Sequence, residues 1–298
     1  MNFGGIEEKY ADREAATFAV IPVPYDLTTT YQSGSRRGPA AILDASCNME
    51  LYDEELDRET YLAGICTFAP VEAEAAGPEP MVRKVEERVA EALQGGKIPV
   101  VLGGEHSISL GAVRALKGRY PNLSVLQFDA HADMRDSYQG SPYSHACIAR
   151  RAREVCPVVQ VGIRSMSAEE AAFLKTSPVK TWSVETIRSG SDWPEALSRD
   201  LSEDVYVTID LDVFDPSIMP STGTPEPGGL LWHEVLSVLR EVSRRRRVRG
   251  FDVVELAPLP GIVAPDFLAA KLAYRMMGYI AGAVDRGRLD RPQAAARK

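Results

Sequence analysis

Eight short apolar runs recur along the chain and predict buried strands. Several of them are continuous rather than alternating with polar residues, which is typical of strands covered on both faces. The runs are FAVIPV (18–23), LAGICTF (62–68), IPVVLG (98–103), LSVLQFD (123–129), PVVQVG (157–162), VKTWS (179–183), VYVTIDL (205–211) and GFDVVEL (250–256).

Amphipathic segments lie between many of these runs and predict helices. The candidates are 81–96, 167–175, 230–247 and 264–284. The first ends in a Gly-Gly pair, and the second opens with Ser167 and Glu170, the spacing of a capping box. Alternating strands and helices predict a parallel sheet with helices on both faces. In such sheets ligands bind where the carboxyl ends of the strands open into a crevice.

Composition indicates a globular protein. The 298 residues include 45% hydrophobic and 26% charged ones, and no repeat or linker divides them, so we expect a single domain over residues 1–298, with 286–298 as a polar tail. A net charge of −8 argues against nucleic acid or an anionic membrane as the main partner. No signal peptide or membrane-spanning run is visible, and the four cysteines form no C-x-x-C pair, so a cytoplasmic protein with reduced thiols is expected.

Charged side chains follow three of the apolar runs. They are His106 after the third run, Asp129, His131 and Asp133 after the fourth, and Asp210, Asp212 and, slightly later, Asp215 after the seventh. The carboxyl ends of parallel strands share one edge of a sheet, and extended residues two apart point to the same side. These side chains are therefore expected to converge.

Such a group of carboxylates is unstable near neutral pH without a cation, because their mutual repulsion raises several pKa values. Two imidazoles and four carboxylates are too many ligands for one first-row ion, so two ions with bridging carboxylates fit better. Oxygen and nitrogen donors without thiolate favour Mn²⁺, with Zn²⁺, Fe²⁺, Co²⁺ and Ni²⁺ as alternatives. Two ions about 3.5–4 Å apart would produce a hydroxide nucleophile from a shared water.

The other two histidines are ambiguous from the sequence. His145 lies in a loop-like stretch, where a histidine alone is more often structural, but beside a metal site it would make a good proton shuttle. His233 lies near the start of a predicted helix and is interpreted as structural or surface-exposed.

The combined motifs resemble the ureohydrolase family of arginases and agmatinases, and the agmatinase-like branch in particular. GGEHS (103–107), DAHAD (129–133) and IDLDVFDPSIMPSTGTPEPGGL (209–230) match its three signatures in order, FDVVELAP (251–258) is similar to a fourth block, and segment 21–46 resembles the substrate-entry region of agmatinase-like members. The resemblance implies an arginase-like fold: a three-layer α/β/α domain around a central eight-stranded parallel sheet.

The resemblance also implies a role for each site residue. One Mn²⁺ would be held by His106, Asp129, Asp133 and Asp210, and the second by Asp129, His131, Asp210 and Asp212. Glu255 would bind the substrate guanidinium, although a Glu at a strand end can equally be a supporting hydrogen-bond partner. A hydroxide shared by the ions would attack the guanidinium carbon, and Asp133 and His145 would supply a proton to the departing amine. Family members are usually trimers or hexamers.

The substrate is the least certain expectation. The loop over 133–151 resembles that of agmatinases more than that of arginases, which favours hydrolysis of agmatine to putrescine and urea, a step of polyamine biosynthesis. Arg135 could instead face the pocket and favour a carboxylate tail, as in 4-guanidinobutyrate, or pair with Asp136; arginine is a further alternative. Two other classes remain open: a non-catalytic metal-binding regulatory subunit, and a deacetylase with a single Zn²⁺.

Overall fold

All eight apolar runs form strands of one sheet. The computed structural model describes residues 1–190, 192–287 and 289. The strands of the main sheet are β1 (Phe18–Val23), β4 (Ile65–Thr67), β5 (Ile98–Gly103), β6 (Leu123–Phe128), β7 (Val158–Ile163), β8 (Lys180–Ser183), β9 (Asp204–Asp210) and β10 (Arg247–Val254). Every neighbouring pair in this sheet is parallel. The predicted parallel sheet is therefore confirmed.

The order of the strands is β4-β1-β5-β10-β9-β6-β7-β8. After β5 the chain crosses to β6 and leaves a gap that β9 and β10 fill later, so the middle of the sheet is assembled from distant parts of the sequence. A change in winding direction of this kind is where α/β sheets bind ligands at their carboxyl edge.

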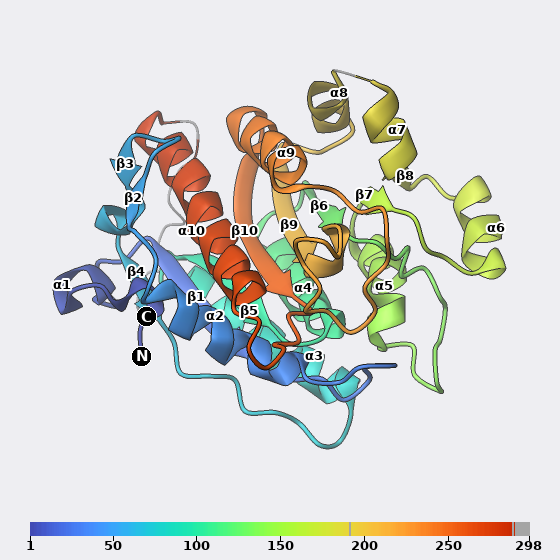
Figure 1. Cartoon of the computed structure of the whole chain (residues 1–298), viewed down its shortest axis with the longest axis horizontal. Coiled ribbons are helices and arrows are strands. Elements are labelled where there is room, and N and C mark those ends of the chain that lie inside the picture. The colour runs from blue at the N-terminus through green and yellow to red at the C-terminus, as the bar shows by residue number, and fades with distance from the viewer. Residues whose placement is uncertain (191, 288, 290–298) are drawn as a thin grey trace.

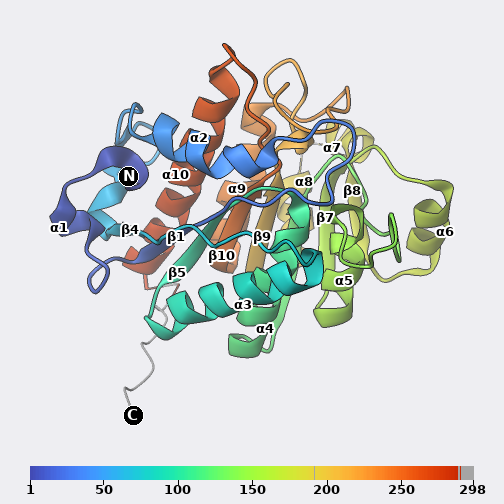
Figure 2. The same cartoon turned by 90° about the horizontal axis from the view of Figure 1, so that it is seen from below.

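Helices cover both faces of the sheet. The longer helices are α2 (Gly38–Ser46), α3 (Pro78–Gln94), α4 (Ser109–Arg119), α5 (Ile148–Val155), α6 (Ala168–Thr176), α9 (Trp232–Arg245) and α10 (Ala264–Asp285); the shorter ones are α1 (Glu8–Ala11), α7 (Val184–Ser189) and α8 (Trp193–Arg199). Figures 1 and 2 show α2, α9 and α10 on one face and α3, α4 and α5 on the other, which makes the three-layer α/β/α arrangement.

Alternation along the strands divides the core between the two faces. On β1, Val20 belongs to the core cluster that includes residues of α2, α9 and α10, whereas its neighbours Ala19 and Ile21 belong to the cluster that includes residues of α3, α4 and α5. Successive strand residues point to opposite faces, so a strand buried on both sides is apolar at most of its positions. This explains why the strand runs in the sequence are continuous.

Smaller elements complete the fold. A two-stranded antiparallel sheet joins β2 (Tyr52–Asp53) to β3 (Arg58–Glu59), and 3₁₀ turns form at Phe3–Gly5, Ser35–Arg37, Thr60–Ala63, His106–Ile108, His145–Cys147 and Leu211–Val213. Within the described residues, no helix combines the length and the apolar character needed to cross a membrane. The polar tail expected over 286–298 lies largely outside the described residues.

Candidate metal and substrate site

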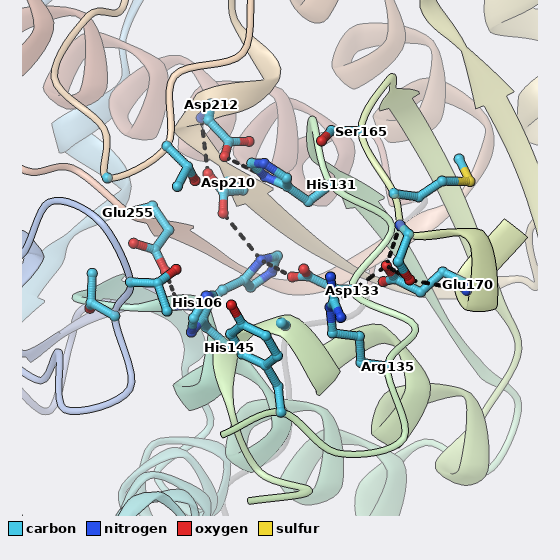
Figure 3. Close-up of a pocket in the computed structure, with 18 residues that line it drawn as sticks. His106, His131, Asp133, Arg135, His145, Ser165, Glu170, Asp210, Asp212 and Glu255 are labelled. Atoms are coloured by element: carbon cyan, nitrogen blue, oxygen red, sulfur yellow. Dashed lines mark hydrogen bonds and ion pairs between the residues drawn. The ribbon is translucent and has the colours of Figure 1, made fainter. Parts of the chain in front are cut away.

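The charged residues predicted from the sequence gather at the carboxyl ends of the four middle strands. His106 follows β5, Glu255 follows β10, Asp210 ends β9, and the segment from Asp129 to Asp133 follows β6. Figure 3 shows the side chains of five of these residues and of Asp212 turned toward one another: His106, His131, Asp133, Asp210, Asp212 and Glu255. The parallel register of these strands brings together segments more than 100 residues apart in the sequence.

His106 lies at the centre of the first cluster. Its Nδ1 is 3.1 Å from Asp129 Oδ2, 3.3 Å from Asp210 Oδ2 and 3.4 Å from Asp133 Oδ2. The ring is 1% exposed, yet Nδ1 makes no hydrogen bond within the described part of the chain. A buried nitrogen without a hydrogen-bond partner, surrounded by three carboxylates, fits a divalent cation bound between them.

His131 and Asp212 form the second cluster. His131 Nδ1 is 2.9 Å from Asp212 Oδ2 and 3.7 Å from Asp129 Oδ1. Asp129 thus presents one carboxylate oxygen to each histidine, as a carboxylate shared by two ions would. In each of two groups, His106–Asp129–Asp210 and Asp129–His131–Asp212, the candidate ligand atoms lie within 4.8 Å of one another.

Burial and mutual repulsion raise the pKa values of two carboxylates of the cluster. Burial, together with the negative charge of Asp129, raises the pKa of Asp133 to about 7. Burial and the charges of Asp212 and Asp129 raise the pKa of Asp210 well above its ordinary value. Divalent cations between these groups would relieve the repulsion and allow all four carboxylates to ionise.

Residues beyond the candidate ligands lie beside the outer nitrogens of both histidines, and the sequence analysis did not identify them. Thr208 Oγ1 lies 2.9 Å from His106 Nε2 and donates to Asp252 Oδ1 at 2.6 Å. Glu226 Oε1 lies 3.7 Å from His131 Nε2 and accepts a hydrogen bond from Ser165. Thr208 and Asp252 are register partners on β9 and β10, so only the strand pairing could have linked them. Outer partners of this kind fix the orientation of ligating imidazoles.

A cavity of about 260 Å³ opens beside the two clusters. Glu255 and His145 line it together with His106, His131, Asp133, Asp210 and Asp212. Glu255 Oε1 accepts a hydrogen bond of 2.6 Å from the backbone N–H of His106, which ties the end of β10 to the end of β5. Burial and the positive charges of His106 and His131 lower the pKa of His145 to about 4, so its ring is neutral at pH 7.

One side of the cavity, which we call its outer wall, is formed by Arg135, Tyr138 and Glu170. Arg135 lines the cavity, stacks over the ring of Tyr138 with 4.7 Å to the centroid, and has its Nε 3.8 Å from Glu170 Oε2. It does not pair with Asp136, which binds Arg151 instead. Of the two alternatives left open by the sequence, Arg135 therefore faces the pocket.

Two further residues of the sequence analysis lie away from the cavity. Asp215 accepts hydrogen bonds from the backbone N–H groups of Ser217, Gly228 and Gly229, so it organises a loop. His233 is exposed on α9.

Comparisons with known proteins match most of the chain. The model of the arginase family matches residues 16–278. Over 278 residues the chain is 41% identical to an N(1)-aminopropylagmatine ureohydrolase of Synechocystis sp., covering 91% of this chain and 90% of the relative. It is 37% identical over 270 residues to an agmatinase of Pyrococcus horikoshii, covering 90% and 93%.

The fold is similar to that of solved structures. The agmatine ureohydrolase of Thermoplasma volcanium superposes with a TM-score of 0.84 at 33% identity, covering 93% of this chain and 94% of that one. Sequence and fold thus match the same group of proteins.

Proposed function

The chain belongs to the arginase family, and from this we propose that it is a binuclear manganese hydrolase that cleaves a guanidino C–N bond and releases urea. The observation that carries the proposal is the arrangement around Asp129, whose two oxygens face two different imidazoles, those of the buried His106 and the half-buried His131. Agmatine, hydrolysed to putrescine and urea, is the substrate that we propose first.

The side chains present fit two divalent ions. We propose that His106, Asp129, Asp133 and Asp210 hold one ion and that Asp129, His131, Asp210 and Asp212 hold the other, with oxygen and nitrogen donors that suit Mn²⁺. When bound, such a pair of ions lowers the pKa of a water molecule toward neutrality and makes it a nucleophile.

The remaining groups of the cavity would bind the substrate and move protons. Glu255, which lines the cavity, would accept hydrogen bonds from a guanidinium, and a charge-assisted pair gives both strength and orientation. The departing amine must take up a proton, because an amide-like anion is a very poor leaving group. Asp133 would relay that proton, and His145 would exchange it with solvent.

His145→Ala tests the role of the shuttle. We expect both ions to stay bound and kcat to fall by about 100-fold or more, the usual contribution of a general acid or base. Metal content, measured by elemental analysis together with kcat, distinguishes a proton shuttle from a support of the metal site. Loss of an ion in the variant would show instead that His145 supports the metal site.

N(1)-aminopropylagmatine is a second candidate substrate. The relative from Synechocystis named for this compound is 41% identical, against 37% for the agmatinase from Pyrococcus horikoshii. Both compounds present the same guanidinium to Glu255 and differ only in the amine tail, which would lie toward the outer wall with Arg135, Tyr138 and Glu170. Arg135 would attract a carboxylate tail, as in 4-guanidinobutyrate or arginine, but Glu170 partly offsets its charge.

Urea release identifies the substrate. We would measure kcat/KM of the manganese-loaded protein on agmatine, N(1)-aminopropylagmatine, 4-guanidinobutyrate and arginine. The highest value on agmatine supports the first proposal, and the highest value on the longer amine supports the second. Faster hydrolysis of either carboxylate compound would contradict both. No turnover of any of the four would favour a regulatory subunit, and a stoichiometry of one Zn²⁺ would favour a deacetylase.

We also propose that the chain is a single domain and forms a homo-oligomer, a trimer or a hexamer. Light scattering measures the mass in solution, and calorimetry shows whether the chain unfolds in one transition. A monomer, or two separate transitions, would contradict the respective proposal.

A further inference from the structure

Two hydroxyl groups lie near the ring of His145, and neither was identified from the sequence. Thr28 Oγ1 lies 3.2 Å from His145 Nδ1 and accepts a hydrogen bond of 3.1 Å from the backbone N–H of the same histidine. Ser144 Oγ is farther from Nδ1, at 3.4 Å. Thr28 does not line the cavity, so it contacts His145 on the side of the ring that faces away from the cavity.

A buried carboxylate holds Thr28 in place. Glu105 is 0% exposed, and its Oε2 accepts a hydrogen bond of 2.6 Å from the backbone N–H of Thr28. Its Oε1 accepts hydrogen bonds from the hydroxyls of Thr28, at 2.7 Å, and of Ser107. Glu105 precedes His106 in the chain, so the segment that carries the first candidate ligand also fixes this loop.

The contacts of Thr28 determine which ring nitrogen of His145 carries a proton. A threonine hydroxyl has one hydrogen to donate and two lone pairs that can accept. The hydrogen goes to Glu105, and one lone pair accepts the backbone N–H of His145. The remaining lone pair faces Nδ1, so the contact between Thr28 and Nδ1 is a hydrogen bond only if Nδ1 donates.

We propose that Thr28, held by Glu105, is a positioning residue that fixes His145 as the tautomer protonated on Nδ1. Nε2 is then the ring nitrogen that takes up and releases protons in the cavity. Tyr138 restricts the ring further, with an edge-to-face contact of 6.0 Å between centroids. The consequence for turnover rests on the proposed function, whereas the tautomer itself does not.

Three substitutions test the role of the hydroxyl. Thr28→Val keeps the shape of the side chain and removes the hydroxyl; we expect kcat to fall about 10- to 100-fold, the cost of a misoriented catalytic group, with a smaller change in KM and unchanged metal content. Thr28→Ser keeps the hydroxyl and should restore kcat to within about threefold of the wild type, as rescue by a conservative variant requires. Thr17→Val is the matched control: Thr17 is 2% exposed, its hydroxyl has no hydrogen-bond partner within the described residues, and its replacement should leave kcat unchanged.

Nitrogen NMR reads the tautomer independently of activity. With ¹⁵N-labelled histidine in the metal-free protein at pH 7, and with His145→Ala to identify the signals, we expect His145 to be protonated on Nδ1 in the wild type, Thr17→Val and Thr28→Ser. Thr28→Val should show a mixture of tautomers.

Several results would overturn the inference. These are a wild-type His145 protonated on Nε2, an unchanged kcat in Thr28→Val, or a Thr28→Ser variant as slow as Thr28→Val. Absence of turnover on every guanidino compound would count against the proposed function alone, and the NMR result would still decide the tautomer.

Discussion

At the scale of single residues, two carboxylates of the site occupy the left-handed region of backbone conformation. Asp133 has φ 51° and Glu255 has φ 66°. Such residues cost about 1–3 kcal/mol each and persist only where neighbouring structure holds them. The carbonyl of Asp133 accepts from the N–H of Arg150, and the N–H of Glu255 donates to the carbonyl of Gly104. Both residues thus have hydrogen bonds that hold their strained backbone at the edge of the cavity.

Glu255→Gln should weaken substrate binding without changing the shape of the site. The amide keeps an oxygen that can accept from the N–H of His106 but loses the negative charge that would pair with a guanidinium. A hydrogen bond to a charged group is worth about 1.5–3 kcal/mol, so kcat/KM should fall by about 10- to 150-fold. Steady-state kinetics on agmatine checks this. An unchanged kcat/KM with intact metal content would show that Glu255 only supports the end of β5.

The sequence predicted the chemically distinctive residues better than their partners. His106, Asp129, His131, Asp133, Asp210 and Asp212 were grouped because their types and positions after strands are unusual, and the structure brings them together. Thr208, Asp252 and Thr28 are of common residue types, and their roles depend on which strand or loop lies opposite them. Their roles follow from contacts over long sequence separations, which a single sequence does not contain.

At the scale of elements, the site is built from abrupt changes at the ends of strands. β5 is followed by a 3₁₀ turn at His106–Ile108, β9 by one at Leu211–Val213, and His145 starts another before α5. Each turn presents a site residue within a few residues of a rigid strand or helix. The strands were predicted from their continuous apolar runs and the helices α3, α6, α9 and α10 from their amphipathic pattern, and the capping box at Ser167 and Glu170 is confirmed. The other six helices among the described residues and the β2–β3 pair were not predicted, and most of them carry too few residues to show a period.

Gly104→Ala should disrupt the turn that presents His106. A Cβ at Gly104 would lie 1.9 Å from the carbonyl oxygen of Tyr25, which is backbone and cannot rotate away. We expect stability to fall by about 1–3 kcal/mol or more, with loss of metal binding. Gly118→Ala in α4 is the control, because its Cβ would meet nothing within 4 Å, and it should raise stability by about 0.5–1 kcal/mol. Denaturant unfolding measures both, and equal effects would contradict the argument.

Glu241 near the end of α9 should contribute stability that depends on pH. Hydrogen bonds from Arg244 and Arg245 lower its pKa from 4.5 to about 2. A lowered pKa in the folded state means that the contribution is complete above about pH 4.5 and disappears as the pH falls through about 2. Glu241→Gln should therefore cost about 0.5–1 kcal/mol at pH 7, as expected of a partly exposed pair, and nothing near pH 2.

Denaturant unfolding at several pH values gives the dependence for Glu241→Gln. Glu87→Gln on α3 is the control, because Glu87 is exposed and forms no ion pair in the described part of the chain. A cost for Glu241→Gln that stays constant from pH 7 to pH 2 would contradict the assignment.

At the scale of the whole molecule, the site depends on the middle of the sheet. β5, β10, β9 and β6 are neighbours, and each contributes a part of the acidic cavity. Ions bound there would link two pairs of strands, β5 with β6 and β9 with β10, that come from distant parts of the sequence. Their binding energy would therefore stabilise the folded chain as a unit rather than one loop of it.

Removal of metal should lower the unfolding temperature of the protein by several degrees. A ligand present at 100 times its Kd and bound only by the folded state adds about 2.7 kcal/mol of stability. Dialysis against a chelator, followed by calorimetry with and without added Mn²⁺, measures the difference. Added Mg²⁺, a harder ion that suits all-oxygen sites, is the control and should restore less. An unfolding temperature insensitive to both ions would argue against a bound pair.

The position of the cavity on the four middle strands also has a consequence for how its backbone exchanges hydrogen with deuterated solvent. Amides of β5, β6, β9 and β10 are bonded to strands on both sides, so they can exchange only when the sheet itself comes apart. The groups that meet the substrate would therefore be attached to the slowest-exchanging framework of the protein, while Thr29 and Thr30, which also line the cavity, belong to a loop outside the sheet.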